Sequence, residues 1–501
     1  MRLAPYVAFV LAAALGAVAL SASAVPVAAV QPRAAEAPPP GDAEAYAAGV
    51  AAAVDSILAD PELPRAFWGL LAVDLATGRT VLRRDADQTF LPASTMKLLT
   101  TAAALDELGA DHRYVTRLYH LGTVTDRGEM RGDLVIRGGG DPSFGSEWIR
   151  ENPLEAWAEA LAEAGVRRVT GRILGDDDRF ADEPYAEGWD VSHIASETYA
   201  PPAGGLAWND NLLPVRIAGG RATAGPPGMA EVVASVEAGR RGRFQVRRVL
   251  GTDDIEIRGT IPSGYRGAVE VPVENPTRYA AFALADALRD AGIAVEAEIA
   301  DADVLASPPE YGAAEPLRAT VSPPLSEIIE RINRKSDNLY AEHVFRSLTP
   351  EGTLSAAAGR VRALLRAAGA ETDGLSIQDG SGLSRKDLIT PDALGALLVH
   401  MDRHPERRAF RASLADGGGA GSTLRNRLRG VPVRAKTGSL LSARALAGYV
   451  RGPQRQQIAF VIFANHYTTS SGRITGAIDD IVRALAAGTR VPREAPSPTV
   501  G

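Results

Sequence analysis

Residues 92–108 read PASTMKLLTTAAALDEL, and the fold and chemistry that we expect follow from this stretch. The run from Thr95 to Leu108 predicts a helix, because alanine, leucine and methionine dominate it. Residues three apart share one helix face, so the Ser94 hydroxyl and the Lys97 amine of this Ser-x-x-Lys pattern should lie side by side. A serine hydroxyl is a weak nucleophile that needs an adjacent base. A lysine supplies that base only if burial or another cation lowers its pKa.

Lysine is rare in this chain, which makes each lysine informative. It occupies only positions 97, 335, 386 and 436, and all other Lys and Arg positions are arginine. Arginine cannot release its proton at accessible pH, whereas a desolvated lysine can. Taken singly, a lysine is more often an ordinary surface cation, and we interpret Lys386 in that way. Lysines that fall into chemical patterns are candidate functional residues.

Two further patterns stand in the last third of the chain. Ser336-Asp337-Asn338 (Ser-x-Asn) lies between predicted helices at 325–332 and 337–348 and can supply a hydroxyl for proton transfer. Taken alone, this pattern is more typical of a helix N-cap. Lys436-Thr437-Gly438 lies on a predicted strand at 431–439, where side chains alternate between faces and glycine lets another backbone approach closely. A lysine on such a strand can bind a carboxylate.

The three patterns in this order form the motif set of β-lactamases and penicillin-binding proteins. The chain resembles one group within that set, the class C low-molecular-mass penicillin-binding proteins, which are D-alanyl-D-alanine carboxypeptidases/endopeptidases. The resemblance covers most of the chain after the N-terminal segment. Five other stretches are similar to signatures of that family: 138–142 (GGGDP), 208–211 (WNDN), 379–385 (DGSGLSR), 422–424 (STL) and 447–450 (AGYV).

The resemblance implies an α/β multidomain protein. Its β-lactamase/transpeptidase-like catalytic domain is an antiparallel sheet flanked by helices, interrupted by an inserted two-domain segment. The long gap between Lys97 and Ser336 fits such an insertion, and the hydrophobic pattern predicts a hairpin at 67–84. The catalytic domain is expected in two segments, at 43–112 and 316–489. Between them we expect inserted domain II at 113–211 and 269–315, with a nested β-rich domain III at 212–268.

By the same resemblance, the reaction is acyl transfer. Ser94 is the implied nucleophile and Lys97 its general base. Ser336 is implied to protonate the leaving amine with the help of Lys436. The backbone N–H groups of Ser94 and Ser439 form the implied oxyanion hole.

The resemblance also implies how the substrate is held. Asn338 is expected to bind the substrate backbone, and Lys436, Thr437 and Ser439 the terminal carboxylate, with Gly438 between them. The implied substrates are peptidoglycan stem peptides cleaved between two D-alanines. β-Lactam antibiotics are implied covalent inhibitors. No metal or cofactor is needed.

The composition and the N-terminal segment indicate the class of protein and its cellular location. Hydrophobic residues make up 46% and charged residues 23%, as in globular domains, and a net charge of −7 argues against a nucleic-acid partner. The absence of cysteine excludes disulfides and thiol catalysis. Residues 1–24 read as a secretory signal peptide, with an uncleaved membrane anchor as the alternative. We expect an exported protein of the periplasm or extracytoplasmic envelope, without a stable membrane span after cleavage, a linker at 25–42 and a disordered tail at 490–501.

Two other functions remain open from the sequence. A β-lactamase shares this fold, but the long insertion and the lack of an identifiable deacylation base argue against it. A penicillin-acylated sensor or a cell-wall-binding scaffold would not turn over substrate. The intact motifs argue against the scaffold, whereas a sensor would retain them. The balance between carboxypeptidase and endopeptidase activity and the oligomeric state stay open.

Overall fold

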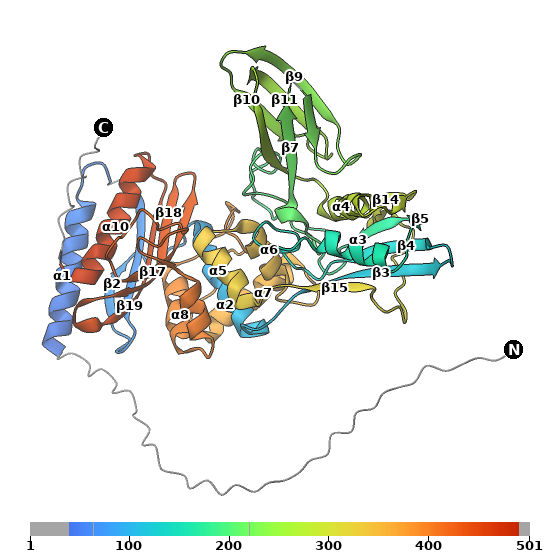
Figure 1. The fold of residues 1–501 in the computed structure, drawn as a ribbon. Helices are drawn as coiled ribbons and strands as arrows, with labels where there is room; N and C mark the ends of the chain where they lie inside the picture. The colour runs from blue at the N-terminus through green and yellow to red at the C-terminus, as the bar shows by residue number, and fades with distance from the viewer. Residues whose placement is uncertain (1–39, 64, 220, 490–501) are drawn as a thin grey trace, which may run out of the picture. The chain divides into compact units, whose positions relative to one another are not determined.

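The computed structural model describes residues 40–489 except residues 64 and 220 (Figure 1). A six-stranded sheet joins the two ends of the chain in the order β16-β17-β18-β19-β1-β2, and every neighbouring pair in it is antiparallel. Its strands are β1 (Phe67–Asp74), β2 (Thr80–Arg84), β16 (Ala415–Asp416), β17 (Val433–Leu440), β18 (Ala443–Arg451) and β19 (Gln457–Asn465).

Helices cover both faces of this sheet, which explains why its central strands are apolar on both sides. The strand β19 is buried at every position from Ile458 to Asn465. One face packs on α1 (Pro40–Leu58) and α10 (Ser471–Ala487), and the other on α2 (Met96–Leu108) and α8 (Pro391–Arg403). Figure 1 shows the sheet between these two helix layers.

The layer that contains α2 carries the helices nearest to the three motifs. The helices α5 (Leu325–Lys335) and α6 (Asn338–Arg346) are separated only by Ser336 and Asp337, and both contact α2. Two further helices, α7 (Leu354–Ala367) and α9 (Arg407–Ser413), complete this layer. The first and second motifs therefore lie at the ends of helices that pack against one another.

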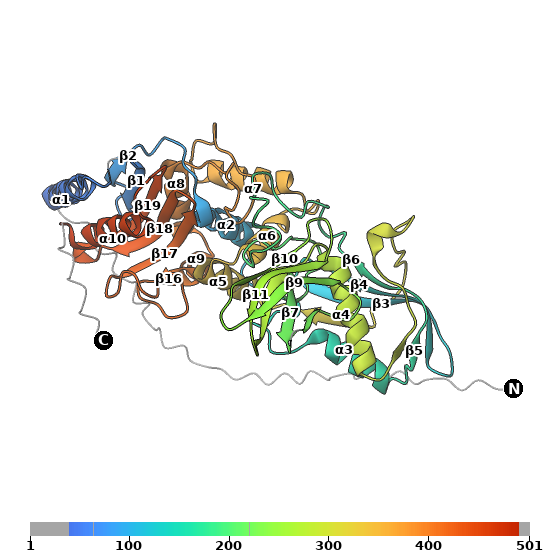
Figure 2. The ribbon, with the colours of Figure 1, turned by 90° about the horizontal axis from the view of Figure 1, so that it is seen from above.

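A second, seven-stranded sheet lies in the middle of the chain. Its order is β13-β5-β4-β3-β15, with β6 paired to β4 and β14 paired to β6. Figure 2 shows the helices α3 (Pro153–Glu163) and α4 (Pro276–Asp290) beside these strands, and α4 contacts β6 and β14. The strands are β3 (Val115–Val124), β4 (Glu129–Arg137), β5 (Arg168–Val169), β6 (Ile173–Asp176), β13 (Ala294–Val295), β14 (Ile299–Asp301) and β15 (Arg318–Val321).

Residues 212–272 form two three-stranded sheets, β12-β7-β8 and β10-β11-β9. One buried apolar cluster contains residues of these sheets, such as Val215 and Ile257, together with residues of α3 and α4, such as Trp157 and Leu284. The β-rich segment thus shares its core with the seven-stranded region. The strands are β7 (Leu212–Ala218), β8 (Arg221–Ala224), β9 (Val232–Gly239), β10 (Phe244–Arg248), β11 (Ile255–Pro262) and β12 (Arg266–Pro272).

The structure confirms the expected fold class and the predicted hairpin at 67–84. Two elements differ from the predicted boundaries. Helix α1 begins at Pro40, within the predicted linker at 25–42. Strand β15 falls in the predicted second catalytic segment at 316–489, but it pairs with β3, which falls in predicted domain II. The domain boundaries as a whole stay predictions. The predicted signal peptide and the tail at 490–501 lie outside the described residues. No helix among residues 40–489 is long and apolar enough to cross a membrane.

Candidate active site

The first motif begins in a tight turn before α2. Ser94 lies in a single 3₁₀ turn, η1 (Ala93–Thr95), rather than in the α-helix itself. Ala93 has a φ of 46°, in the left-handed region that L residues rarely adopt. Ser94 is half-buried and lines a pocket of about 800 Å³. Within this turn the Thr95 N–H donates to the carbonyl oxygen of Pro92 and the Met96 N–H to that of Ala93.

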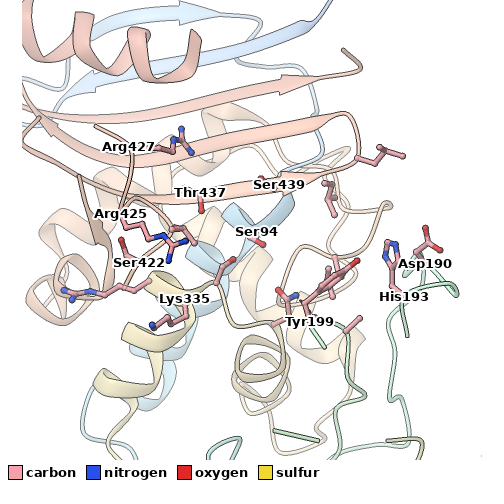
Figure 3. A pocket seen from close by; sticks show the side chains of 18 of the residues that line it. Ser94, Asp190, His193, Tyr199, Lys335, Ser422, Arg425, Arg427, Thr437 and Ser439 are labelled. Atoms are coloured by element: carbon pink, nitrogen blue, oxygen red, sulfur yellow. Dashed lines mark hydrogen bonds between the residues drawn. The ribbon is translucent and has the colours of Figure 1, made fainter. Parts of the chain in front are cut away.

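Gly438 allows strand β17 to lie directly against this turn. A Cβ on Gly438 would lie 2.7 Å from the carbonyl oxygen of Pro92 and 2.8 Å from the Cβ of Ala445. Both distances are shorter than van der Waals contact, so a larger residue would push the strand away from the turn. The third motif therefore passes next to Ser94, and Figure 3 shows Thr437 and Ser439 along the neighbouring strand.

Lys97 is fully buried and makes three polar contacts. Its Nζ lies 3.1 Å from Ser94 Oγ, 2.5 Å from Asn338 Oδ1 and 2.6 Å from the carbonyl oxygen of Ser381. The helical spacing thus brings hydroxyl and amine together, as expected. A neutral amine has two N–H donors and one lone pair. It can donate to the two carbonyl oxygens and accept the proton of the hydroxyl.

The surroundings of Lys97 favour the neutral amine. Burial lowers the pKa of Lys97 to about 8, because water no longer solvates the charged form. The carboxylates of Asp379 and Glu342 act in the opposite direction and limit the shift. The amine therefore loses its proton near pH 8, which gives a larger neutral fraction for general-base catalysis than an exposed lysine has.

Asn338 links Lys97 to the inserted region of the chain. It is the first residue of α6, and Asp337 is the N-cap, since the Asp337 side chain accepts a hydrogen bond from the N–H of Tyr340. While Asn338 Oδ1 accepts from Lys97, its Nδ2 donates to the carbonyl oxygen of Tyr199 at 2.7 Å. An amide nitrogen has two hydrogens, so one N–H of Asn338 remains for a bound ligand.

A second serine–lysine pair lies across from the first. Lys436 is fully buried, and its Nζ donates to Ser336 Oγ at 2.9 Å and to the carbonyl oxygen of Thr437 at 2.7 Å. Burial lowers the pKa of Lys436 well below its usual value, and the charge of Lys97 lowers it further. A lowered pKa makes the ammonium form of Lys436 a stronger acid, but it also lowers the fraction of Lys436 that carries the proton. The site thus contains two hydroxyls, each in contact with its own buried lysine.

The backbone of Ser336 is strained, and we expect this strain to lower the free energy of unfolding of the protein. It is the C-cap of α5 with a φ of 64°, a conformation that costs a non-glycine residue about 1 kcal/mol or more. Both Ser336→Gly and Ser336→Ala remove the hydroxyl, but only glycine relieves the strain. The glycine variant should therefore be more stable than the alanine variant by about 1 kcal/mol in chemical denaturation. Equal stabilities of the two variants would show that the turn is unstrained.

A buried ion pair supports the Lys97 side of the site. Glu342 and Arg346 lie one turn apart on α6, both are fully buried, and they pair at 2.7 Å. The second carboxylate oxygen of Glu342 accepts hydrogen bonds from the N–H groups of Gly380 at 3.0 Å and Ser381 at 2.9 Å. Because the Ser381 carbonyl in turn contacts Lys97, this pair holds a backbone group that positions the amine.

One wall of the pocket comes from residues 189–199 of the inserted region. The Trp189 Nε1 donates to Asp379 Oδ2 at 2.9 Å, and Tyr199 contacts Asn338 as described above. The side chains of Asp190, His193 and Tyr199 border the pocket on this side (Figure 3). No sequence motif predicts this wall of the pocket. Asp379 is part of the family signature at 379–385, but no role could be predicted for it from the sequence.

All eight sequence-predicted site residues come together around this pocket. Five of them line it: Ser94, Ser336, Asn338, Thr437 and Ser439. The amines of Lys97 and Lys436 are buried, and Gly438 packs on the turn that contains Ser94. Lys386 lies on the surface in an ion pair with Glu187, in agreement with its interpretation as a surface cation.

The chain is similar to known proteins over most of its length. The chain matches the model of the D-Ala-D-Ala carboxypeptidase 3 (S13) family over residues 50–485. It is 33% identical over 459 residues to a D-alanyl-D-alanine carboxypeptidase of Actinomadura sp. (strain R39), with 86% of this chain and 82% of the relative covered. It is 25% identical over 430 residues to the D-alanyl-D-alanine carboxypeptidase DacB of Haemophilus influenzae, with 80% and 86% covered.

Solved structures show the same fold. The crystal structure of penicillin binding protein 4 (dacB) from Haemophilus influenzae matches with a TM-score of 0.73 and 21% identity, over 87% of this chain and 99% of that one. A second crystal structure of that protein, complexed with a β-lactam, matches with a TM-score of 0.68 and 20% identity, over 88% and 99% of the two chains.

Proposed function

The chain belongs to the D-Ala-D-Ala carboxypeptidase 3 (S13) family of serine peptidases, and we propose that Ser94 is its nucleophile and peptidoglycan stem peptides its substrates. The observation that carries this proposal is the contact between Ser94 and a buried lysine whose pKa is about 8. A hydroxyl at the mouth of a pocket with a base beneath it is the arrangement that nucleophilic catalysis needs.

Acylation begins at this pair. The Oγ of Ser94 forms a bond to the carbonyl carbon between the two D-alanines, and its proton passes to Lys97 Nζ. The carbonyl oxygen becomes an oxyanion, for which the N–H groups of Ser94 and Ser439 are the proposed donors. One such donor contributes about 3 kcal/mol to the stability of the transition state in a related acyl transfer.

Release of the first product needs a proton at the leaving nitrogen. As the carbon–nitrogen bond breaks, the Ser336 hydroxyl donates its proton to the amine and regains one from Lys436, which it contacts at 2.9 Å. Lys97 gains one proton from Ser94, and Lys436 loses one to Ser336. The two lysines together therefore carry the same number of protons before and after acylation. Water then attacks the acyl-enzyme and releases the shortened peptide from Ser94.

The pocket also suggests how the substrate lies. Within the described residues, β16 pairs with β17 only at Ala435 and Arg434, so the β17 edge from Thr437 to Leu440 has no strand on that side. An extended peptide can bind along such an edge, with the free Asn338 N–H opposite. Thr437 is the proposed contact of the terminal carboxylate, because Lys436 behind it is fully buried.

The setting follows from the substrate. We propose that the protein acts outside the cytoplasm, in the periplasm or the extracytoplasmic cell envelope, where stem peptides are exposed. The apolar N-terminal segment of the sequence supports export. β-Lactams are the proposed covalent inhibitors, since they present a reactive carbonyl to the same serine.

The test of the proposed function is product release. Purified protein is incubated with a peptide that ends in D-Ala-D-Ala, and free D-alanine is quantified beside hydrolysis of a β-lactam. The proposal requires repeated release of D-alanine and slow hydrolysis of the β-lactam. Rapid β-lactam hydrolysis would identify a β-lactamase, and acylation without any turnover of peptide would identify a sensor.

The pKa of Lys97 predicts how acylation depends on pH. Only the neutral amine can accept a proton, so the second-order rate of acylation by a β-lactam should rise about tenfold per pH unit below about pH 8 and level off above it. Stopped-flow measurements from about pH 6 to pH 9, with circular dichroism to verify folding, give this profile. A rate that stays constant across this range would exclude Lys97 as the titrating base.

A further inference from the structure

Two cations without a carboxylate partner in the described part of the chain lie on one side of the pocket around Ser94, whereas Asp190 on the other side is paired with Arg385, which also lines the pocket. Figure 3 shows Lys335 and Arg425 on one side of Ser94, and Asp190, with the aromatic rings of His193 and Tyr199, on the other. Lys335 and Arg425 belong to different segments, the end of α5 and the loop between β16 and β17. Lys335 lies against this loop, since its Nζ is 3.5 Å from where a Cβ on Gly421 would be, and both cations line the pocket.

These two cations differ from the other arginines that line the same side. Arg334 forms an ion pair with Glu330 at 2.9 Å, and Arg427 forms one with Asp479 at 2.8 Å. The charges of both arginines are therefore compensated within the protein. Lys335 and Arg425 are exposed, and among the described residues neither has a carboxylate or a hydrogen-bond acceptor as partner. A pair of uncompensated cations at the edge of a pocket attracts an anionic part of a ligand.

The position of Lys335 indicates which half of the substrate would carry this anionic group. Lys335 directly precedes Ser336, the group that protonates the leaving amine in the function proposed above. The departing half of the substrate must therefore lie on the Ser336 side of Ser94, toward Lys335 and Arg425. In the same proposed function, the acylating half lies along β17 past Ser439, on the side of Tyr199 in Figure 3.

We propose that Lys335 and Arg425 form a subsite for a second carboxylate on the leaving half of the substrate. The subsite rests on the proposed function and extends it, because the first carboxylate, next to the scissile bond, is already provided for at Thr437. A single D-alanine carries only that first carboxylate. The substrate class that uses the whole pocket is a peptide whose departing residue, or departing peptide, carries an additional acidic group.

The test compares departing residues of equal shape and different charge. Peptides that end in D-Ala-D-Glu and D-Ala-D-Gln differ only in the side-chain carboxylate, and a peptide that ends in D-Ala-D-Ala serves as the reference. For the wild type, kcat/KM should favour D-Glu over D-Gln by about fivefold, a modest effect because exposed charges are screened by water. The preference should shrink in high salt.

The double variant Lys335→Gln/Arg425→Gln should reduce the D-Glu to D-Gln ratio to about one. The matched control is Arg429→Gln, which removes an exposed arginine of the same loop that does not line the pocket and should keep the wild-type ratio. A wild-type ratio near one, or a ratio that the double variant leaves unchanged, would refute the subsite. Failure to release D-alanine from the reference peptide would refute the proposed function instead, so the two failures are distinguishable.

Discussion

Replacement of Lys97 by arginine should lower the rate of acylation of Ser94 by about 10³-fold. Positioned general bases contribute roughly 10² to 10⁴ in rate, and arginine keeps the positive charge but cannot accept a proton near neutral pH. Lys97 Nζ is the group that contacts Ser94 Oγ, at 3.1 Å, and burial lowers its pKa to about 8. The rate is measured as the time course of covalent labelling by a fluorescent β-lactam.

Two further variants make this result specific. Lys386→Arg is the matched control, because Lys386 is an exposed lysine in an ion pair with Glu187, and it should label at the wild-type rate. Lys97→Met removes the amine without adding a permanent charge to a buried site, and it should label as slowly as the arginine variant. Wild-type labelling by either Lys97 variant would show that another group takes the proton.

Replacement of Arg346 by methionine should destabilise the protein by about 3–5 kcal/mol. Removal of one partner from a buried ion pair leaves the other charge without compensation, and Glu342 is fully buried. Arg346 also donates to the carbonyl oxygen of Glu183 at 2.6 Å, which would lose its partner. The free energy of unfolding is obtained from urea denaturation.

The double variant Glu342→Gln/Arg346→Met provides the control for this prediction. It removes both charges, and a glutamine can still accept the hydrogen bonds from Gly380 and Ser381. The double variant should therefore be more stable than Arg346→Met alone. If the double variant is as unstable as the single one, packing of the arginine rather than its charge stabilises this region.

The local chemistry of the site could be predicted from sequence because it depends on short spacings. The helical interval between Ser94 and Lys97 predicts their contact, and the alternation of a strand predicts that Lys436 and Thr437 face different sides. One local detail differs, since the predicted helix begins at Thr95, whereas Thr95 belongs with Ser94 to a 3₁₀ turn and α2 begins at Met96. The neighbouring Ala93 has a positive φ of 46°, which an alanine at that position does not predict.

Contacts between distant segments could not be predicted in this way. The hydrogen bond from Asn338 to Tyr199 and that from Trp189 to Asp379 join segments that only the tertiary fold brings together. The spacing of Glu342 and Arg346 is visible in the sequence, but charged pairs one turn apart usually face solvent. Their complete burial depends on the packing of α6 against α2 and α7, which hydrophobic patterns do not specify.

The most direct measurement of the central claim is the location of the acyl group. The protein is labelled with a β-lactam and digested, and mass spectrometry identifies the modified peptide, alongside a folded Ser94→Ala variant. We expect one adduct, on the peptide that contains Ser94, and no adduct on the variant. An adduct on any other residue, or labelling that persists in Ser94→Ala, would contradict this claim.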